Sequence, residues 1–173
     1  MKKLLFVLTA IFIVQTVFFT LSNAQVKQVR IKVNGLACPF CAYGLEKKLK
    51  KLDGVGEVKI SLNKGMATLD NKDNQSIEFE NLTSVVKDAG FSATEITATV
   101  KGVISKSDDI YFLSVVDSNK KLILENNEKL QNLLSSLNGV EKAVSVKGIL
   151  YQKETPGHKS HPFTLSIQRF EIK

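Results

Sequence analysis

The sequence predicts an α+β fold in two parts, preceded by a targeting segment. Two observations predict the first part: short stretches in which apolar and polar residues alternate, and two stretches between them with apolar residues at helical spacing. A third observation predicts the second part, where five alternating stretches accompany a single helical one. The chain has 173 residues, enough for one medium domain or two small ones.

The composition excludes several protein classes. The chain is 43% hydrophobic and 24% charged, which is typical of a globular protein and excludes a disordered or collagenous one. Its two cysteines cannot form a disulfide-dense scaffold. The formal net charge is +7, and without Lys2 and Lys3 it is +5. We interpret this mild basic excess as a solvated surface and expect no nucleic-acid partner.

Residues 1–24 have the pattern of a secretory signal peptide. Lys2 and Lys3 precede an apolar run from Leu4 to Leu21, and the small residues Ser22 and Ala24 follow at the positions that a signal peptidase requires. We therefore expect cleavage after Ala24, an exported protein in the periplasm or its equivalent, and no stable membrane insertion after cleavage. The alternative is an uncleaved N-terminal anchor, because the apolar run could just span a bilayer.

Residues 25–97 are expected to form the first domain. Alternation predicts its strands, apolar residues at helical spacing predict its helices, and Asn63-Lys64-Gly65 predicts a tight turn. The order strand, helix, strand, strand, helix, strand is the ferredoxin-like βαββαβ arrangement. The expected strands are 28–33, 58–62, 66–70 and 92–97, and the expected helices are 42–52 and 82–89.

Residues 98–173 are expected to form a small OB-like β-barrel, because five strands with one helix between the third and fourth fit that Greek-key fold. A shift in apolar parity between Ile167 and Phe170 predicts a β-bulge in the last strand. The alternative is a degenerate repeat of the first domain, since Leu134 to Val140 echoes Leu49 to Val55. The strand count and the lack of a second cysteine pair disfavour it. The expected strands are 100–104, 111–116, 122–124, 144–151 and 163–172, and the expected helix is 130–137.

The residues with the clearest chemistry are Cys38-Pro39-Phe40-Cys41, between the first strand and the first helix. Two thiols three residues apart at a helix start can point at one centre, and the helix N-terminus favours thiolate. A site with two soft sulfur ligands prefers Cu(I) or Hg(II) and binds Zn(II) or Cd(II) with lower preference. Two ligands cannot complete the tetrahedral coordination of a structural zinc site. The simpler alternative is that Cys38 and Cys41 are small buried apolar residues, or that they form a disulfide without a functional role.

The segment Gly35 to Cys41 resembles the G-M-x-C-x-x-C loop of heavy-metal-associated domains, as in copper chaperones and the periplasmic mercury-binding protein. Leu45 to Val55 and Asp88 to Phe91 resemble the ends of that family's two helices, so the resemblance covers residues 26–97. It implies a metal site at Cys38 and Cys41 and ligand exchange with a metal-transporting membrane protein or another metal chaperone. Leu36 departs from the family's usual Met.

Two other functions are open. The sequence C-P-F-C is also typical of glutaredoxins, so Cys38 and Cys41 could perform thiol–disulfide exchange. A thioredoxin fold, however, needs a downstream proline near the thiols, and both Pro156 and Pro162 lie in the second part. We therefore predict that the protein is not an enzyme. The second alternative is a non-catalytic interaction module that acts through the OB-like domain.

Weaker candidates complete the site predictions. His158 and His161 could form a secondary metal site, although a solvated turn is the simpler interpretation. A basic helix side could dock an acidic partner, or could only improve solubility. Three apolar or aromatic residues could shield the metal from water, or could only belong to the core. The docking candidates are Lys47, Lys48, Lys50 and Lys51, and the shielding candidates are Leu36, Tyr43 and Phe91.

Overall fold

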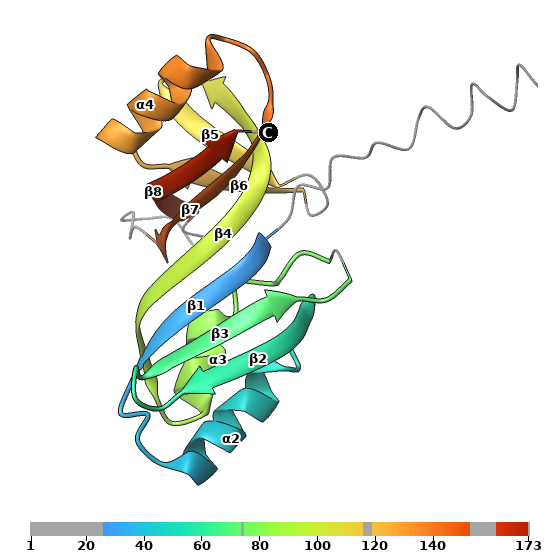
Figure 1. The fold of residues 1–173 in the computed structure, drawn as a ribbon, viewed down its shortest axis with the longest axis vertical. Coiled ribbons are helices and arrows are strands. Elements are labelled where there is room, and N and C mark those ends of the chain that lie inside the picture. The colour runs from blue at the N-terminus through green and yellow to red at the C-terminus, as the bar shows by residue number, and fades with distance from the viewer. Residues whose placement is uncertain (1–25, 74, 116–118, 153–161, 173) are drawn as a thin grey trace, which may run out of the picture.

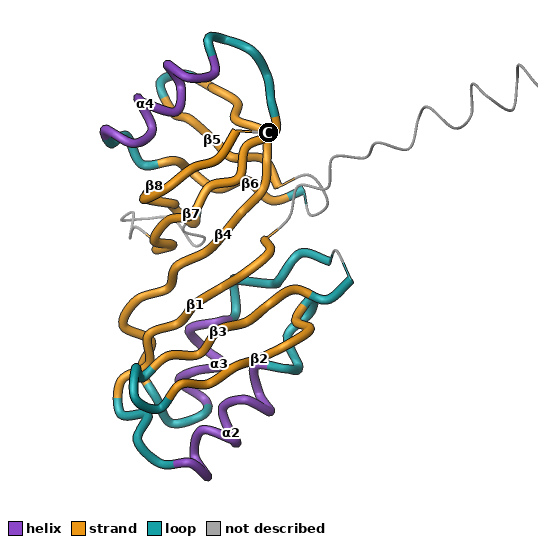
Figure 2. Tube along the Cα trace, in the orientation of Figure 1, coloured by secondary structure: helices purple, strands orange, loops and turns teal. Residues whose placement is uncertain are grey.

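The computed structural model of the chain describes residues 26–73, 75–115, 119–152 and 162–172. The proposed signal peptide, the end of the strand expected at 111–116, and the pair His158 and His161 lie outside these residues. The described part contains eight strands and three helices, whose arrangement is drawn in Figures 1 and 2. They are β1 (Val26–Asn34), α2 (Pro39–Leu49), β2 (Val55–Ser61), β3 (Met66–Asn71), α3 (Leu82–Asp88), β4 (Ser92–Ser107), β5 (Ile110–Val115), β6 (Lys120–Leu124), α4 (Glu128–Leu137), β7 (Ala143–Gln152) and β8 (Phe163–Ile172).

The first half of the chain confirms the ferredoxin-like arrangement. Its antiparallel strands follow the order β2-β3-β1-β4, and α2 and α3 pack on one face of this sheet (Figure 1). The helices bury the apolar residues that the helical spacing indicated, including Leu45 and Leu82. The first helix begins earlier than expected, at Pro39, because proline lacks an N–H and is well suited to the first turn of a helix.

The second half forms a closed five-stranded barrel. β4, β5, β6, β8 and β7 are neighbours in this order, and pairing between β7 and β4 closes the ring. Only β6 and β8 pair in parallel among these strands. α4 lies between β6 and β7 in the sequence, as expected. Its N-cap is Asn127, whose side-chain oxygen accepts a hydrogen bond of 2.9 Å from the Leu130 N–H.

The predicted bulge in the last strand is confirmed. Lys147 pairs with Arg169, whereas the next residue, Gly148, pairs with Ile167. Gln168 is therefore the extra residue on β8, at the position where the apolar parity shifts. Gly148 faces this irregularity closely, because a Cβ there would lie 2.2 Å from the Ser166 carbonyl oxygen.

The predicted boundary at residue 97/98 falls within a strand. The strands expected at 92–97 and 100–104 are one continuous strand, β4. Between Thr97 and Val100 its two edges pair with different halves of the molecule: Ala98 pairs with Val29 of β1 and with Gly148 of β7. One sheet therefore runs from the first half into the barrel, as Figure 2 shows.

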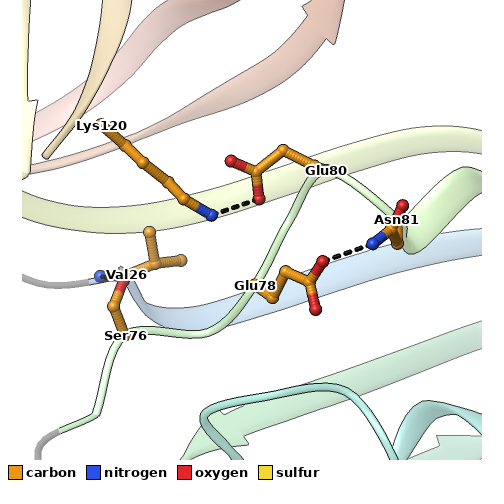
Figure 3. A network of polar contacts seen from close by, with 6 residues as sticks. All are labelled: Val26, Ser76, Glu78, Glu80, Asn81 and Lys120. Carbon is orange, nitrogen blue, oxygen red and sulfur yellow. Dashed lines mark hydrogen bonds and ion pairs between the residues drawn. The ribbon is translucent and has the colours of Figure 1, made fainter. Parts of the chain in front are cut away.

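A second connection lies in the segment before α3. The buried Phe79 ring meets the ring of Phe163 of the barrel edge-on, with 5.0 Å between centroids. Lys120, at the start of β6, forms an ion pair of 2.6 Å with Glu80 and places its ammonium 5.2 Å from the centre of the Phe79 ring. Figure 3 shows this pair beside Val26, whose N–H donates a 3.1 Å hydrogen bond to Ser76. The barrel and the first half thus also meet through side chains.

Candidate metal centre

The candidate site begins at a sharp turn after β1. Gly35 has φ of +79°, a conformation that favours glycine, and the Ala37 N–H donates to the Gly35 carbonyl at 2.9 Å. Leu36 points into the core and is 4% exposed. It therefore anchors the loop among apolar residues, and its role in shielding the sulfurs from solvent stays a prediction. This anchor fixes the chain just before Cys38.

Cys38 caps the N-terminus of α2. Its backbone is extended, its carbonyl accepts the first helical hydrogen bond from Ala42 at 3.0 Å, and its Sγ accepts a 3.4 Å hydrogen bond from the Cys41 N–H. The first turn contains no acidic residue, so no carboxylate competes with sulfur for the positive end of the helix dipole. Lys47 and Lys48 complement the opposite end of the dipole in the last turn.

The two thiols differ in acidity. The hydrogen bond from the Cys41 side chain, together with the Cys41 N–H, lowers the pKa of Cys38. The pKa of Cys41 is raised, first because its thiol donates that hydrogen bond to Cys38 and then because of desolvation. As pH rises, Cys38 is therefore the first of the two to become a thiolate, and Cys41 is the hydrogen-bond donor that stabilises this thiolate.

Both sulfurs are free, and Cys41 is exposed while Cys38 is half-buried. Within the described ranges, no three side chains from His, Cys, Asp and Glu gather into a metal-binding group. What the described residues offer here is a pair of soft ligands open to solvent. Such a pair can hold a thiophilic ion and leave coordination positions accessible to another molecule.

The proposed shielding residues lie in different environments. Tyr43 is 58% exposed, and the Lys47 ammonium lies 4.7 Å from its ring centre. Phe91 is half-buried and packs against the core, and its N–H donates to the Val86 carbonyl at 3.1 Å. None of the contacts described for these rings reaches a cysteine, so a shielding role for either ring stays a prediction.

The four lysines proposed for docking divide into two groups. Lys50 forms a 2.6 Å ion pair with Glu46, and Lys48 donates to the Asp88 carbonyl at 2.8 Å. Lys47 lies over Tyr43, and Lys51 is exposed after the helix. Lys50 is thus engaged with a carboxylate of its own helix, and the other three lysines lie at or just after the C-terminal end of α2, opposite the end that carries the cysteines.

Two residues on the exposed side of α2 were not among the predicted site residues. Phe40, between the cysteines, is 88% exposed. Gly44 lies one turn later in the helix, and a Cβ there would meet no atom within 4 Å. Glycine in a helix interior destabilises it by about 0.5–1 kcal/mol relative to alanine. The helical spacing could have indicated both, since Ala42 and Leu45 face the core and Phe40 and Gly44 lie on the other side.

Comparison with known proteins identifies the domain that presents the cysteines. Residues 30–92 match the heavy-metal-associated domain. The chain is also 30% identical over 61 residues to copper chaperone CopZ of Staphylococcus epidermidis, a match that covers 35% of this chain and 88% of CopZ. The chain belongs to the heavy-metal-associated domain family. The family match ends at residue 92, the first residue of β4, so it does not extend to α4 or to the strands β5 to β8.

The region similar to this chain is a small part of one known protein and nearly the whole of another. The chain is 36% identical over 72 residues to copper-transporting ATPase 2 of Rattus norvegicus, covering 42% of this chain but 5% of the ATPase. Among solved structures, oxidized MerP from Ralstonia metallidurans is 24% identical, with a TM-score of 0.34 and coverage of 43% of this chain and 96% of MerP.

The part of the chain described by the structure contains no helix that is long and apolar enough to cross a membrane.

Proposed function

We propose that this heavy-metal-associated protein is an exported carrier or scavenger that binds one soft metal ion through Cys38 and Cys41. The observation that carries the proposal is the geometry at the start of α2, where the Cys38 sulfur accepts from the Cys41 N–H at 3.4 Å and both thiols are free. Thiolates prefer Cu(I) and Hg(II), while Zn(II) and Cd(II) would be held less selectively. The likeness to CopZ favours Cu(I).

The accessibility of the sulfurs supports release of the ion by ligand exchange. A thiol of a partner protein loses its proton as its sulfur bonds to the ion. One bond from the ion to Cys41 or Cys38 then breaks, and the released thiolate takes up a proton. No electrons are transferred. The partner would be a metal-transporting membrane protein or another metal chaperone, with acidic groups opposite Lys47, Lys48 and Lys51.

Export is part of the proposal and is supported by the sequence of residues 1–24. We expect the mature chain to begin at Gln25. Intact-mass analysis of the protein recovered from its own compartment tests this, and a mass that includes residues 1–24 together with recovery in the membrane fraction would support the anchor instead. In an oxidising compartment the metal-free pair would rest as a disulfide.

For the second half we propose an OB-like barrel that serves partner binding or self-association. Its support is the closed five-stranded ring with α4 between the third and fourth barrel strands. In this proposal residues 25–97 and 98–173 keep separate roles, although they share β4.

Anaerobic titration with Cu(I) against a competing chelator tests the metal proposal. We expect one ion per reduced chain and loss of binding in the double variant Cys38→Ser/Cys41→Ser. The matched control is His158→Ala/His161→Ala, which should bind as the wild type does. Tight binding by the cysteine variant would place the site elsewhere, with the two histidines as the next candidates.

A further inference from the structure

The sheet has an open face on the side away from α2 and α3, and this face continues from the first half into the wall of the barrel. Side chains alternate along a strand, so the residues on either side of the buried Val29, Ala98 and Val146 point out of it. In Figure 1 β1 and β4 run side by side with no helix in front of them. We call this surface the open sheet face, and its central residues are Gln28, Arg30, Thr97, Thr99, Lys147 and Arg169.

Strand pairing brings cations from distant parts of the sequence into one strip on this face. Lys147 of β7 pairs with Arg169 of β8 and, at its other edge, with Thr99 of β4. Arg30 of β1 pairs with Thr97, two residues before Thr99. Because neighbouring strands are ~4.8 Å apart and successive residues ~3.4 Å apart, the three cations lie within a strip of roughly 15 Å.

The charges of this strip are not compensated within the part of the chain that the structure describes. Lys147 and Arg169 lie directly opposite each other on neighbouring strands, and like charges in this position destabilise a sheet. Among the described residues, no carboxylate forms an ion pair with Arg30, Lys147 or Arg169. An anion from outside the chain would relieve this repulsion.

The carboxylates on the strands of the open sheet face do not neutralise the strip. They belong to Glu57, Asp70, Glu95 and Glu171. Glu57 forms an ion pair of 2.8 Å with Lys59, and Asp70 accepts a hydrogen bond of 2.7 Å from the Gln28 side chain. Glu95 accepts a hydrogen bond of 3.4 Å from the Thr97 hydroxyl. Three of the four carboxylates are thus engaged with other side chains, and the strip keeps an excess of positive charge.

The open sheet face is hollowed at both ends of the strip. A hollow of about 370 Å³ in the first half is lined by Arg30, Lys59, Lys64 and Thr68 among others. A second hollow, of about 180 Å³ in the barrel, is lined by Thr99, Ser145, Lys147, Arg169, Phe170 and Glu171. The bulge at Gln168 lies directly beside Arg169, and bulges re-aim the side chains next to them. Each hollow therefore combines cations with neutral hydroxyl groups.

We propose that the open sheet face binds a linear anionic polysaccharide, which lies across the strands from Arg30 to Arg169. The three cations bind its carboxylate or sulfate groups, and one such group lies between Lys147 and Arg169. The hydroxyls of Thr97 and Thr99 form hydrogen bonds with the sugar hydroxyls. This binding function is separate from the proposed metal binding, because no residue of the strip belongs to the cysteine loop or to α2.

The side chains of this face favour a polysaccharide over other polyanions. Single-stranded nucleic acids bind to cationic grooves that also present aromatic rings for stacking, and membrane surfaces bind faces that carry large apolar side chains. In the described residues, the exposed large apolar side chains lie on α2, on β5, after α4 and at the last residue of β8. The strip itself offers cations, hydroxyls and an amide.

The experiment measures binding of fluorescently labelled heparin to the purified, reduced, metal-free protein by anisotropy, with neutral dextran as the uncharged comparison. The cation variant is Arg30→Gln/Lys147→Gln/Arg169→Gln. The matched control, Lys87→Gln/Lys129→Gln/Lys142→Gln, removes the same charge from exposed lysines on α3, on α4 and before β7. The hydroxyl variant is Thr97→Val/Thr99→Val. Duplex DNA and vesicles of phosphatidylglycerol with phosphatidylcholine are tested at equal concentrations of negative charge.

We expect the cation variant to bind heparin about tenfold more weakly than the wild type, and the control to change by less than about threefold. Binding should weaken as NaCl rises, with a shallower slope for the cation variant because fewer counterions are released. The hydroxyl variant should bind about fivefold more weakly with an unchanged salt slope. Without heparin, Arg169→Gln should melt no lower than the wild type, because it removes a like-charge pair.

Equal losses in the cation variant and in the control would overturn the site, because they would show unspecific attraction to a basic protein. An unchanged affinity in the hydroxyl variant, or binding of duplex DNA or vesicles as tight as that of heparin, would overturn the assignment to a polysaccharide. A Cu(I) titration of the cation variant should give one ion per chain, as for the wild type, so that failure of the metal proposal is seen separately.

Discussion

Lys120 of the barrel and Glu80 of the metal-binding half form an ion pair of 2.6 Å across the two parts of the protein. About a third of each side chain is exposed, at 35% and 36%, so solvent screens the pair and it contributes about 0–1 kcal/mol. The Phe79 ring below it is buried against Phe163. The apolar contact is therefore the stronger connection.

We expect Phe79→Ala to lower the free energy of unfolding by about 3–5 kcal/mol, because it removes a buried ring and leaves a cavity. Lys120→Met should cost at most about 2 kcal/mol, since it removes a solvent-screened charge pair and the contact of the ammonium with the Phe79 ring. Urea unfolding measures both changes. A larger loss for Lys120→Met than for Phe79→Ala would show that the ion pair is the main connection.

The two cysteines should react at different pH values in the reduced, metal-free protein. Thiolate is the reactive form, and the Cys41 thiol and N–H lower the pKa of Cys38 while that of Cys41 is raised. Alkylation by iodoacetamide should therefore begin at lower pH for Cys38 than for Cys41, as read by fragment-ion mass spectrometry. Cys41→Ala should move the Cys38 profile to higher pH. Coincident profiles for the two thiols in the wild type would contradict this assignment.

Tyr151 should make the barrel sensitive to alkali. Desolvation, followed by a 2.8 Å hydrogen bond from its hydroxyl to the Glu125 carboxylate, raises the pKa of Tyr151. A raised pKa means that the folded state favours the neutral phenol, so this contribution is complete below the unfolded pKa of about 10 and is lost as pH rises through the folded value.

Tyr151→Phe should accordingly cost about 0.5–1.5 kcal/mol at pH 7, through loss of the hydrogen bond. Above about pH 10, the reference pKa of tyrosine, the difference in unfolding free energy between variant and wild type should shrink. The reason is that ionisation of the phenol stabilises the unfolded wild type, and the variant has no phenol at this position. Chemical unfolding from pH 7 to 11 measures the difference. A difference that stays constant over this range would refute the linkage.

Residues 98–173 expressed alone should fold without metal but with a lower melting temperature than the whole protein. The fragment keeps the pairing of β4 with β5 and β7, but it loses the β1 partner of Ala98 and the contact of Phe163 with Phe79. A barrel of this size is marginally stable even when complete. Circular dichroism and thermal melting, with and without Cu(I), test this expectation. A fragment that folds only after addition of metal or of residues 25–97 would refute separate domains.

The sequence by itself determined the features that depend on short-range chemistry. Alternation and helical spacing are local, so they located the strands around Val29 and Val58 and the helices that bury Leu45 and Leu82. The bulge near Gln168 was visible for the same reason, as a change of parity within one strand. The cysteine pair was equally local, because an N-cap and the first turn of a helix lie within four residues.

Only the tertiary structure decided how these elements join. Val29 and Gly148 are far apart in the sequence, yet both pair with Ala98, and no pattern within β4 indicates that its two edges serve different halves. Strand pairing joins whichever edges the whole fold brings together, so the predicted boundary fell inside a continuous strand. Helical spacing could have placed Phe40 and Gly44 on the side of α2 away from the core, but it gives no measure of their surroundings. Their exposure, and the open space beside Gly44, depend on where Tyr43, Lys47 and the carbonyl of Asp88 lie in the folded chain.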